Sequence, residues 1–178
     1  LGYKTTTALL RDPAAWYHVV ATYDSPNNTA GERMRLYLNG ERVTALSESG
    51  DVGQNFESYQ FNTAIPHFVG TYSYDSSSQN NQCWDGYLAE AYFIDGHSLD
   101  GSYFGETNAG TNQWQPKEPK DIKQAVTFGT NGFYLPFSND ALATSFADAN
   151  YHTPHTVTAT GSAHTDTAVK KFGTASAQ

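Results

Sequence analysis

The sequence contains little sulfur, little positive charge and few of the residues that build helices. Among its 178 residues there are one Cys and one Met. A single thiol cannot close an internal disulfide, so the fold must depend on its apolar core. Ala, Leu, Glu and Lys are thinly and unevenly spread, which disfavours a helical bundle. No apolar run approaches the ~20 residues of a transmembrane helix, so we expect no membrane insertion.

Basic residues are also scarce: 10 Lys and Arg stand against 18 Asp and Glu, a net charge of −8. Phosphate binding needs clustered cationic side chains, so nucleic acid is not an expected partner. The densest basic group is Arg33, Arg35 and Arg42, which falls on an expected hairpin. We interpret these three as solvated residues on strand faces.

Aromatic residues, by contrast, are abundant, with 12 Tyr and 10 Phe. Such rings favour pleated sheets over helices. In residues 33–43 (RMRLYLNGERV), Met34, Leu36 and Leu38 alternate with other side chains. This spacing predicts a strand with one buried face. Asn-Gly at residues 39–40 tolerates the positive φ angles of a type I′ turn, so a second strand is expected to return after it.

Several other short runs have strand character and are separated by turn residues, namely residues 16–23, 67–72, 87–94 and 132–137. Ser98 is expected to cap a short helical turn. Residues 108–121, with two prolines, indicate an extended connection. Many short strands without a long helix predict an all-β, antiparallel sandwich or jelly roll. From residue 141 onward the sequence is rich in Ala, Thr and Ser, and we expect a surface tail with little to bury.

Three motifs together resemble the laminin-G-like, or concanavalin A-like, jelly-roll family. They are WYHVV at residues 16–20, LYLNG at residues 36–40 and WDGYLAE at residues 84–90. The resemblance implies an antiparallel jelly-roll β-sandwich. It covers roughly residues 11–137, and several strands that family members have before residue 11 are missing here, so the segment is expected to be incomplete.

Further motifs resemble the version of this module found in tailed bacteriophages, especially marine ones. These are YFIDGHSLD at residues 92–100, FGE at 104–106, WQPK at 114–117 and GTNGFYL at 129–135. Such modules occur in tail-fibre and other virion structural proteins. The resemblance therefore implies a virion or extracellular location, with other virion proteins or copies of the chain itself as partners.

The last residues, VKKFGTASAQ at 169–178, resemble the opening strand of a second module of the same type. We therefore expect residues 1–140 to form one jelly-roll module. Residues 141–178 would form a connection and the start of the next module, in a longer chain of tandem modules. Exposed sheet edges of a partial module would need strands from elsewhere.

Some proteins of this architecture are glucanases, which carry paired carboxylates on one face of a strand. Here Glu90 and Asp95 are five residues apart, which places them on opposite faces of a regular strand. We therefore expect no catalytic residues and interpret Glu90 as structural. Cys83 has no catalytic pattern around it and is expected to be a packed thiol, and His18 a half-buried residue.

The resemblance also raises the question of a calcium ion, because laminin-G-like modules often hold one at a loop rim. Asp24, Asp75 and Asp85 lie at expected strand ends and could supply hard oxygen ligands. No single loop shows a series of ligands, so the alternative is that these carboxylates are structural. No other cofactor is expected.

Aromatic side chains near the expected loops are the candidates for ligand binding, since rings stack on sugar faces. They are Tyr72, Tyr74, Trp84 and Trp114. The competing interpretation is that these rings fill the sandwich or a subunit contact. The favoured function is a non-catalytic structural or adhesion module of a phage tail fibre or related appendage. It would contribute to recognition of host-surface glycans or to particle assembly. A secreted or cell-surface carbohydrate-binding module attached to an enzyme is the alternative, and a hydrolase is third.

Overall fold

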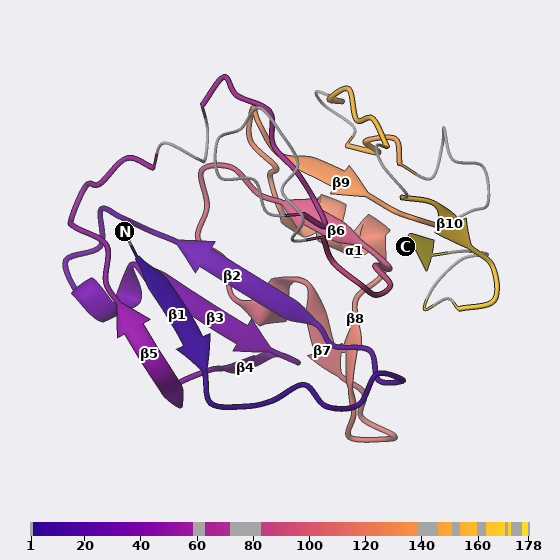
Figure 1. Ribbon diagram of the computed structural model, residues 1–178, viewed down its shortest axis with the longest axis horizontal. Coiled ribbons are helices and arrows are strands. Elements are labelled where there is room, and N and C mark those ends of the chain that lie inside the picture. Colours follow the sequence, from indigo (N-terminus) through magenta and orange to yellow (C-terminus); the bar gives the residue numbers. More distant parts are fainter. Residues whose placement is uncertain are drawn as a thin grey trace. The chain divides into compact units, whose positions relative to one another are not determined.

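The computed structural model describes residues 2–58, 63–71, 83–138, 146–150, 154–159, 163–169, 171 and 176–177. In these ranges the regular structure is mostly short strands paired in antiparallel sheets, with one α-helix (Figure 1). The expectation of an all-β protein is therefore confirmed. No helix among the described residues is long and apolar enough to cross a bilayer.

The chain forms two compact units, and each unit is built from two separate stretches of sequence. Unit 1 contains residues 1–57 and 96–127, and unit 2 contains residues 58–95 and 128–178. The chain therefore leaves unit 1, enters unit 2, returns to unit 1 and ends in unit 2.

The first stretch of unit 1 holds two sheets. A three-stranded sheet joins β2 (Val19–Tyr23), β3 (Met34–Leu38) and β4 (Glu41–Arg42). A two-stranded sheet pairs β1 (Tyr3–Thr6) with β5 (Leu46–Gly50). Figure 1 shows β1 and β5 beside β3. At Gly2 the backbone lies so close to the side chains of Met34 and Val52 that a Cβ there would overlap both.

The turn between β3 and β4 is the one expected from the sequence. Asn39 and Gly40 both have positive φ angles, of 48° and 84°. A type I′ turn requires this backbone, and its twist matches that of the two strands it joins. Asn39 also accepts a hydrogen bond at Oδ1 from the backbone N–H of His18, at 2.9 Å. The predicted hairpin is confirmed, and its turn is tied to β2.

The expected burial pattern of this hairpin is wrong in one respect. Tyr37 alternates with the three residues expected to form the buried face, yet it is the most buried residue of β3, with an exposed fraction of 8%. Met34, Leu36 and Leu38 are only partly buried. Arg35 lies on the same face as Tyr37 and is also partly buried, so both faces of β3 are covered.

The second stretch of unit 1 contains more regular structure than the sequence indicated. Residues 108–121 were expected to be an extended connection, but β8 (Trp114–Pro116) pairs there with β7 (Gly105–Thr107). The only described α-helix, α1 (Pro119–Ala125), follows, with Pro119 in its first turn. Ile122 holds α1 in place, since its exposed fraction is 1%. Unit 1 also contains two described 3-10 turns, η1 (Ala30–Glu32) and η2 (Gly101–Tyr103). Asp100, rather than Ser98, caps η2.

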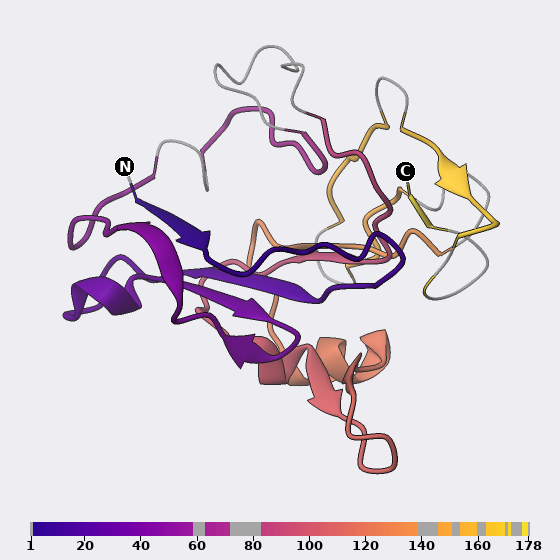
Figure 2. The ribbon, with the colours of Figure 1, turned by 60° about the horizontal axis from the view of Figure 1, so that its bottom comes forward.

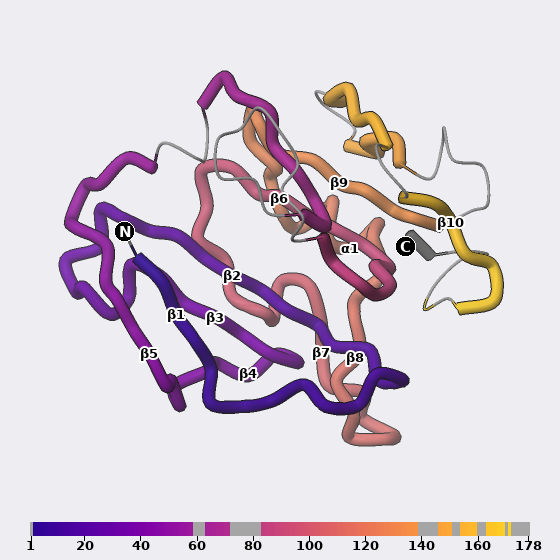
Figure 3. Tube along the Cα trace, viewed as in Figure 1, coloured from indigo at the N-terminus to yellow at the C-terminus, as the bar shows by residue number. Residues whose placement is uncertain are grey.

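Unit 2 is centred on β6 (Ala91–Phe93) paired with β9 (Phe133–Leu135), side by side in Figure 3. A second pair joins β10 (Thr165–Asp166) and β11 (Ser176–Ala177). The strand expected over residues 67–72 is wrong in its described part. There the chain bends, and Thr71 makes a single bridge to Cys83.

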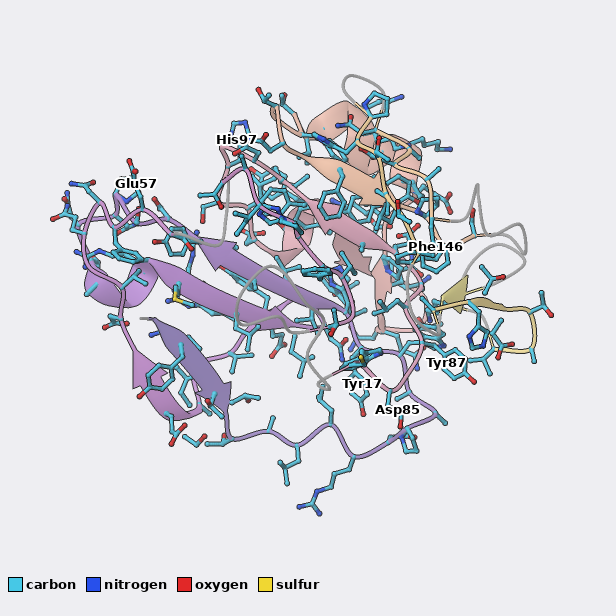
Figure 4. All side chains as sticks on the ribbon, turned by 45° about the horizontal axis from the view of Figure 1, so that its top comes forward. Tyr17, Glu57, Asp85, Tyr87, His97 and Phe146 are labelled. Atoms are coloured by element: carbon cyan, nitrogen blue, oxygen red, sulfur yellow. The ribbon has the colours of Figure 1, made fainter. Side chains whose placement is uncertain are left out.

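The region after residue 141 was expected to have little to bury, and its described residues contradict this. Phe146, labelled in Figure 4, packs with Val157 against the core formed by Leu135 and Phe137. The rings of Phe146 and Phe137 meet edge to face, with centroids 5.2 Å apart. Composition alone was misleading because two apolar residues among many polar ones are enough to cover a small core.

Polar contacts reinforce this packing. Asp148 accepts hydrogen bonds from the backbone N–H groups of Tyr134 and Asn150, both at 2.9 Å, and from that of His155 at 2.8 Å. Asn150 is 7% exposed and donates to the carbonyl of Gly132. These contacts attach the segment to β9 and to the residue before it.

Candidate functional site

The most exposed aromatic ring of the described residues is that of Trp84 in unit 2, with an exposed fraction of 60%. Its backbone is held next to residues far from it in sequence, because its N–H donates to the carbonyl of Gly70 at 2.7 Å. Cys83 and Thr71 form the adjacent bridge, with Sγ and Oγ1 3.7 Å apart. The base of this surface is therefore fixed by pairing between two chain segments.

Glycine lets the Trp84 ring lie close to the backbone. A Cβ at Gly86 would come within 2.8 Å of Nε1 of Trp84, which means that the indole covers the Gly86 backbone. Val69, one residue before Gly70, is itself 48% exposed. We call Val69, Gly70, Trp84 and Gly86 the Trp84 platform. A flat ring supported from beneath and open above is suited to stacking against an apolar face of a ligand.

The other aromatic candidates have different surroundings. Trp114 lies on β8 in unit 1 and is only partly exposed. Its ring lies against the backbones of Gly40 and Gly105, where a Cβ would overlap it. Its Nε1–H donates to Nδ1 of His18 at 3.1 Å. The contacts of Trp114 are thus those of a packed ring. Tyr72 and Tyr74 lie outside the described residues.

His18 is half-buried, as expected, and its Nδ1 accepts a hydrogen bond from the Trp114 indole. Burial lowers the pKa of this imidazole from its ordinary value. A proton on Nδ1 would also remove the acceptor that Trp114 uses. Burial and the hydrogen bond therefore both favour the neutral form.

Of the three carboxylates considered for calcium, Asp24 is in unit 1, Asp85 is in unit 2 and Asp75 lies outside the described residues. Asp24 is partly buried and accepts a hydrogen bond from Nδ2 of Asn27 at 3.1 Å. Asp85, labelled in Figure 4, is exposed and directly follows Trp84. Among the described residues, no three His, Cys, Asp or Glu side chains gather as a metal site would require. The calcium site remains a prediction.

Three titratable side chains contact one another around Glu90 in unit 2. Tyr134 donates to Oε1 of Glu90 at 2.9 Å, and Tyr92 lies 3.4 Å from Oε2. The two phenol rings are stacked, with centroids 4.5 Å apart. Burial, and then the nearby charge of Glu90, raise the pKa of Tyr92 well above its ordinary value. The phenol stays neutral and donates, so it is not activated as a nucleophile.

This cluster was only partly visible in the sequence. Glu90 was expected to be structural, and its carboxylate does serve as an acceptor for two hydroxyl groups. The observed partners of this carboxylate are Tyr92 and Tyr134. The two-residue spacing of Glu90 and Tyr92 could have indicated one of them, because alternate residues of a strand share a face.

The three arginines of the hairpin region are engaged within unit 1. Arg33 donates to the carbonyl of Val52 at 2.8 Å, and Arg35 donates to Oγ of Ser98 at 2.7 Å. Arg42 forms a two-pronged ion pair with Glu32, at 2.6 and 2.9 Å. Their charges are therefore directed at neighbouring groups of the same unit rather than presented together to a phosphate.

Cys83 was expected to be a packed thiol, but it is exposed beside Trp84. Comparison with protein-family models, with curated proteins and with solved structures finds no match to this chain.

Proposed function

We propose that this chain is a non-catalytic virion structural or adhesion module, of a phage tail fibre or related appendage. It would act by contacting host-surface glycans or neighbouring subunits. We propose further that its strands belong to a jelly-roll sandwich of the laminin-G-like type. The proposal combines the motifs at residues 16–20, 36–40 and 84–90 with one structural observation. That observation is the Trp84 platform, in which Trp84 is 60% exposed and its backbone is held by a hydrogen bond to Gly70.

The platform supports binding because it combines area with rigidity. Tryptophan offers a large apolar surface with few rotatable bonds, so little conformational entropy is lost when a ligand covers it. The ring lies against the Gly86 backbone, and the hydrogen bond from the Trp84 N–H to the Gly70 carbonyl holds the Trp84 backbone in place. Asp85, the residue after Trp84, is exposed, and its carboxylate can accept hydrogen bonds from sugar hydroxyls.

The Glu90 cluster supports the non-catalytic part of the proposal. Glycoside hydrolysis needs a carboxylic acid and a second carboxylate on either side of the scissile bond. The carboxylate of Glu90 instead accepts hydrogen bonds from two neutral tyrosines. Its arrangement matches that of a group that stabilises the pairing of β6 and β9.

A glycan array tests the proposal, with the wild-type chain compared with Trp84→Ala and Trp84→Phe. We expect sugar binding by the wild type, at least tenfold weaker binding by Trp84→Ala, and largely retained binding by Trp84→Phe, because a stacking surface remains. Stacking on an aromatic ring contributes about 0.5–1.5 kcal/mol beyond the area that the ring buries, and about 1.4 kcal/mol corresponds to tenfold in affinity. Sedimentation of the same proteins measures self-association, the assembly function in the proposal.

A chain that binds no glycan and does not associate with itself contradicts the proposal. So does hydrolysis of a bound glycan that disappears in Glu90→Gln, because that would make Glu90 catalytic. The alternative, a carbohydrate-binding module of a larger enzyme, is supported if the full-length chain continues into a hydrolase domain. Adjacent genes for portal, tail or capsid proteins support the virion assignment instead.

A further inference from the structure

Unit 1 contains an open groove of about 490 Å³. Its lining residues belong to η2, β7, β8, α1 and the link between β8 and α1. Figure 2 shows these elements next to one another at the bottom of the view. None of the candidate residues from the sequence lines it. Tyr103 stands on one wall with an exposed fraction of 42%, and Pro116 lies on the strand that forms part of the lining. The groove therefore offers two apolar rings to a ligand.

The walls of the groove are held by buried neighbours. Phe104, next to Tyr103, is 7% exposed, and its carbonyl accepts a hydrogen bond from the N–H of Lys117 at 2.9 Å. Asp100 caps the 3-10 turn that carries Tyr103, by accepting from the N–H of Ser102 at 2.9 Å. Ile122 fixes α1 from within the unit. A groove that is already shaped loses little entropy on binding.

Polar groups in the groove are oriented by each other. The Gln115 side chain accepts a hydrogen bond from Nδ2 of Asn108 at 3.0 Å, and its own Nε2 lies 3.5 Å from Oε1 of Glu106. This chain of contacts sets the position of the Glu106 carboxylate beside the groove. Carboxylate and amide oxygens next to exposed rings match the needs of a pyranose, which has an apolar face and hydroxyl donors at its edge.

The charge of the lining selects among sugars. Glu106, Glu118 and Asp121 contribute three carboxylates, and Lys117 contributes the one ammonium group. Nζ of Lys117 donates to the carbonyl of Ser102 at 2.6 Å, so it is held against the wall. An anionic sugar would meet net negative charge here, and like charges at close range disfavour binding.

We infer that this groove is a binding site for a neutral saccharide and that its carboxylates exclude acidic sugars. The inference rests on the proposed function in that it takes glycan recognition as the role of the chain. The groove is a second contact surface, and it shares no residue with the Trp84 platform. The inference also specifies the class of sugar that is bound.

Saturation-transfer NMR and isothermal calorimetry can test whether the groove binds neutral saccharides. The neutral probes are maltotriose, cellotriose, chitotriose, mannotriose and lactose. The acidic probes are sialyllactose and trigalacturonic acid. We expect at least one neutral probe to bind and both acidic probes to bind at least tenfold more weakly. Tyr103→Ala should weaken the neutral probe about tenfold or more, a loss of about 1.4 kcal/mol. The matched control is Tyr3→Ala, since Tyr3 is 50% exposed in the same unit and does not line the groove.

A second variant tests selectivity rather than affinity. The combined change Glu106→Gln, Glu118→Gln and Asp121→Asn removes the negative charge, and we expect it to bring the affinity for sialyllactose to within a few-fold of that for lactose. Two results would overturn the inference: no neutral probe binds, or Tyr103→Ala binds the neutral probe as the wild type does. If Trp84→Ala abolishes glycan binding while Tyr103→Ala does not, the groove is not the site and the proposed function stands.

Discussion

In unit 1, the side chains of His18 and Trp114 fix each other's positions. The imidazole of His18 accepts the indole N–H of Trp114, and Trp114 in turn covers the backbones of Gly40 and Gly105. The hydrogen bond requires an unprotonated Nδ1 on His18, and the ring position requires glycine at residues 40 and 105. The neutral state of His18 is therefore part of the structure of unit 1.

The stability of unit 1 should depend on pH through His18. Burial lowers the folded-state pKa of His18, so the unfolded chain takes up the proton first as the pH falls below about 6.5. Below that value the free energy of unfolding decreases until the folded-state pKa is passed. His18→Asn keeps an acceptor for Trp114 but cannot titrate in this range.

Denaturant unfolding from about pH 7.5 down to about pH 5 checks this. The wild type should lose stability over this range, and His18→Asn should lose measurably less. Equal slopes in the two proteins would mean that His18 does not contribute the dependence. The other histidines are common to both proteins, so their effects cancel in the comparison.

At the scale of elements, β9 of unit 2 depends on a segment that follows it. Asp148 accepts three backbone hydrogen bonds, one of them from Tyr134 in the middle of β9. Removing this carboxylate would leave three N–H groups without their acceptor, two of them on residues that are buried.

We expect Asp148→Ala to lower the free energy of unfolding by about 2–3 kcal/mol, since each hydrogen bond to a charged group contributes about 1.5–3 kcal/mol and water can replace some of them. The control is Asp51→Ala, which removes an ion pair with Lys4 in which Asp51 is 40% exposed. Such a pair contributes about 0–1 kcal/mol. Chemical denaturation measures both. Equal losses in the two variants would show that Asp148 does not hold β9.

The elements also show what the sequence could and could not indicate. The hairpin of β3 and β4 was predictable because Asn39-Gly40 specifies its turn locally. The burial of Tyr37 and the presence of helix α1 could not be predicted from the sequence. Which face of a strand is covered depends on distant packing, and Pro119 was interpreted as a loop residue although it also begins helices. For the candidate sites, the sequence indicated Trp84 because it is an aromatic residue near an expected loop. The groove could not be predicted from the sequence, because Tyr103, Gln115 and Asp121 come together only through η2, β8 and α1.

The whole molecule consists of two units whose boundaries do not follow a single cut in the sequence. The boundary expected at residue 140 would separate β9 from Phe146, Asp148 and Val157, all of which contact β9 or the core beside it. These contacts join the two sides of that position.

A chain ending at residue 140 should therefore keep unit 1 and weaken unit 2. Hydrogen exchange measured strand by strand is the appropriate readout, because it reports local opening. We expect protection of the β6 and β9 amides to fall by about tenfold or more, while the β2 and β3 amides keep theirs. Unchanged protection in β9 would show that residues after 140 contribute nothing to its stability.

The order in which the chain leaves unit 1, enters unit 2 and returns has a consequence for biosynthesis. The first 57 residues emerge from the ribosome long before residues 96–127, which complete the same unit. During that interval the strands of unit 1 lack the packing contacts that residues 96–127 provide. Unit 2 likewise lacks part of its core until residues 128–178 are translated. Such a nascent chain must keep two unfinished cores apart from each other and from neighbouring chains, so its yield in a cell should respond to translation speed and to chaperones.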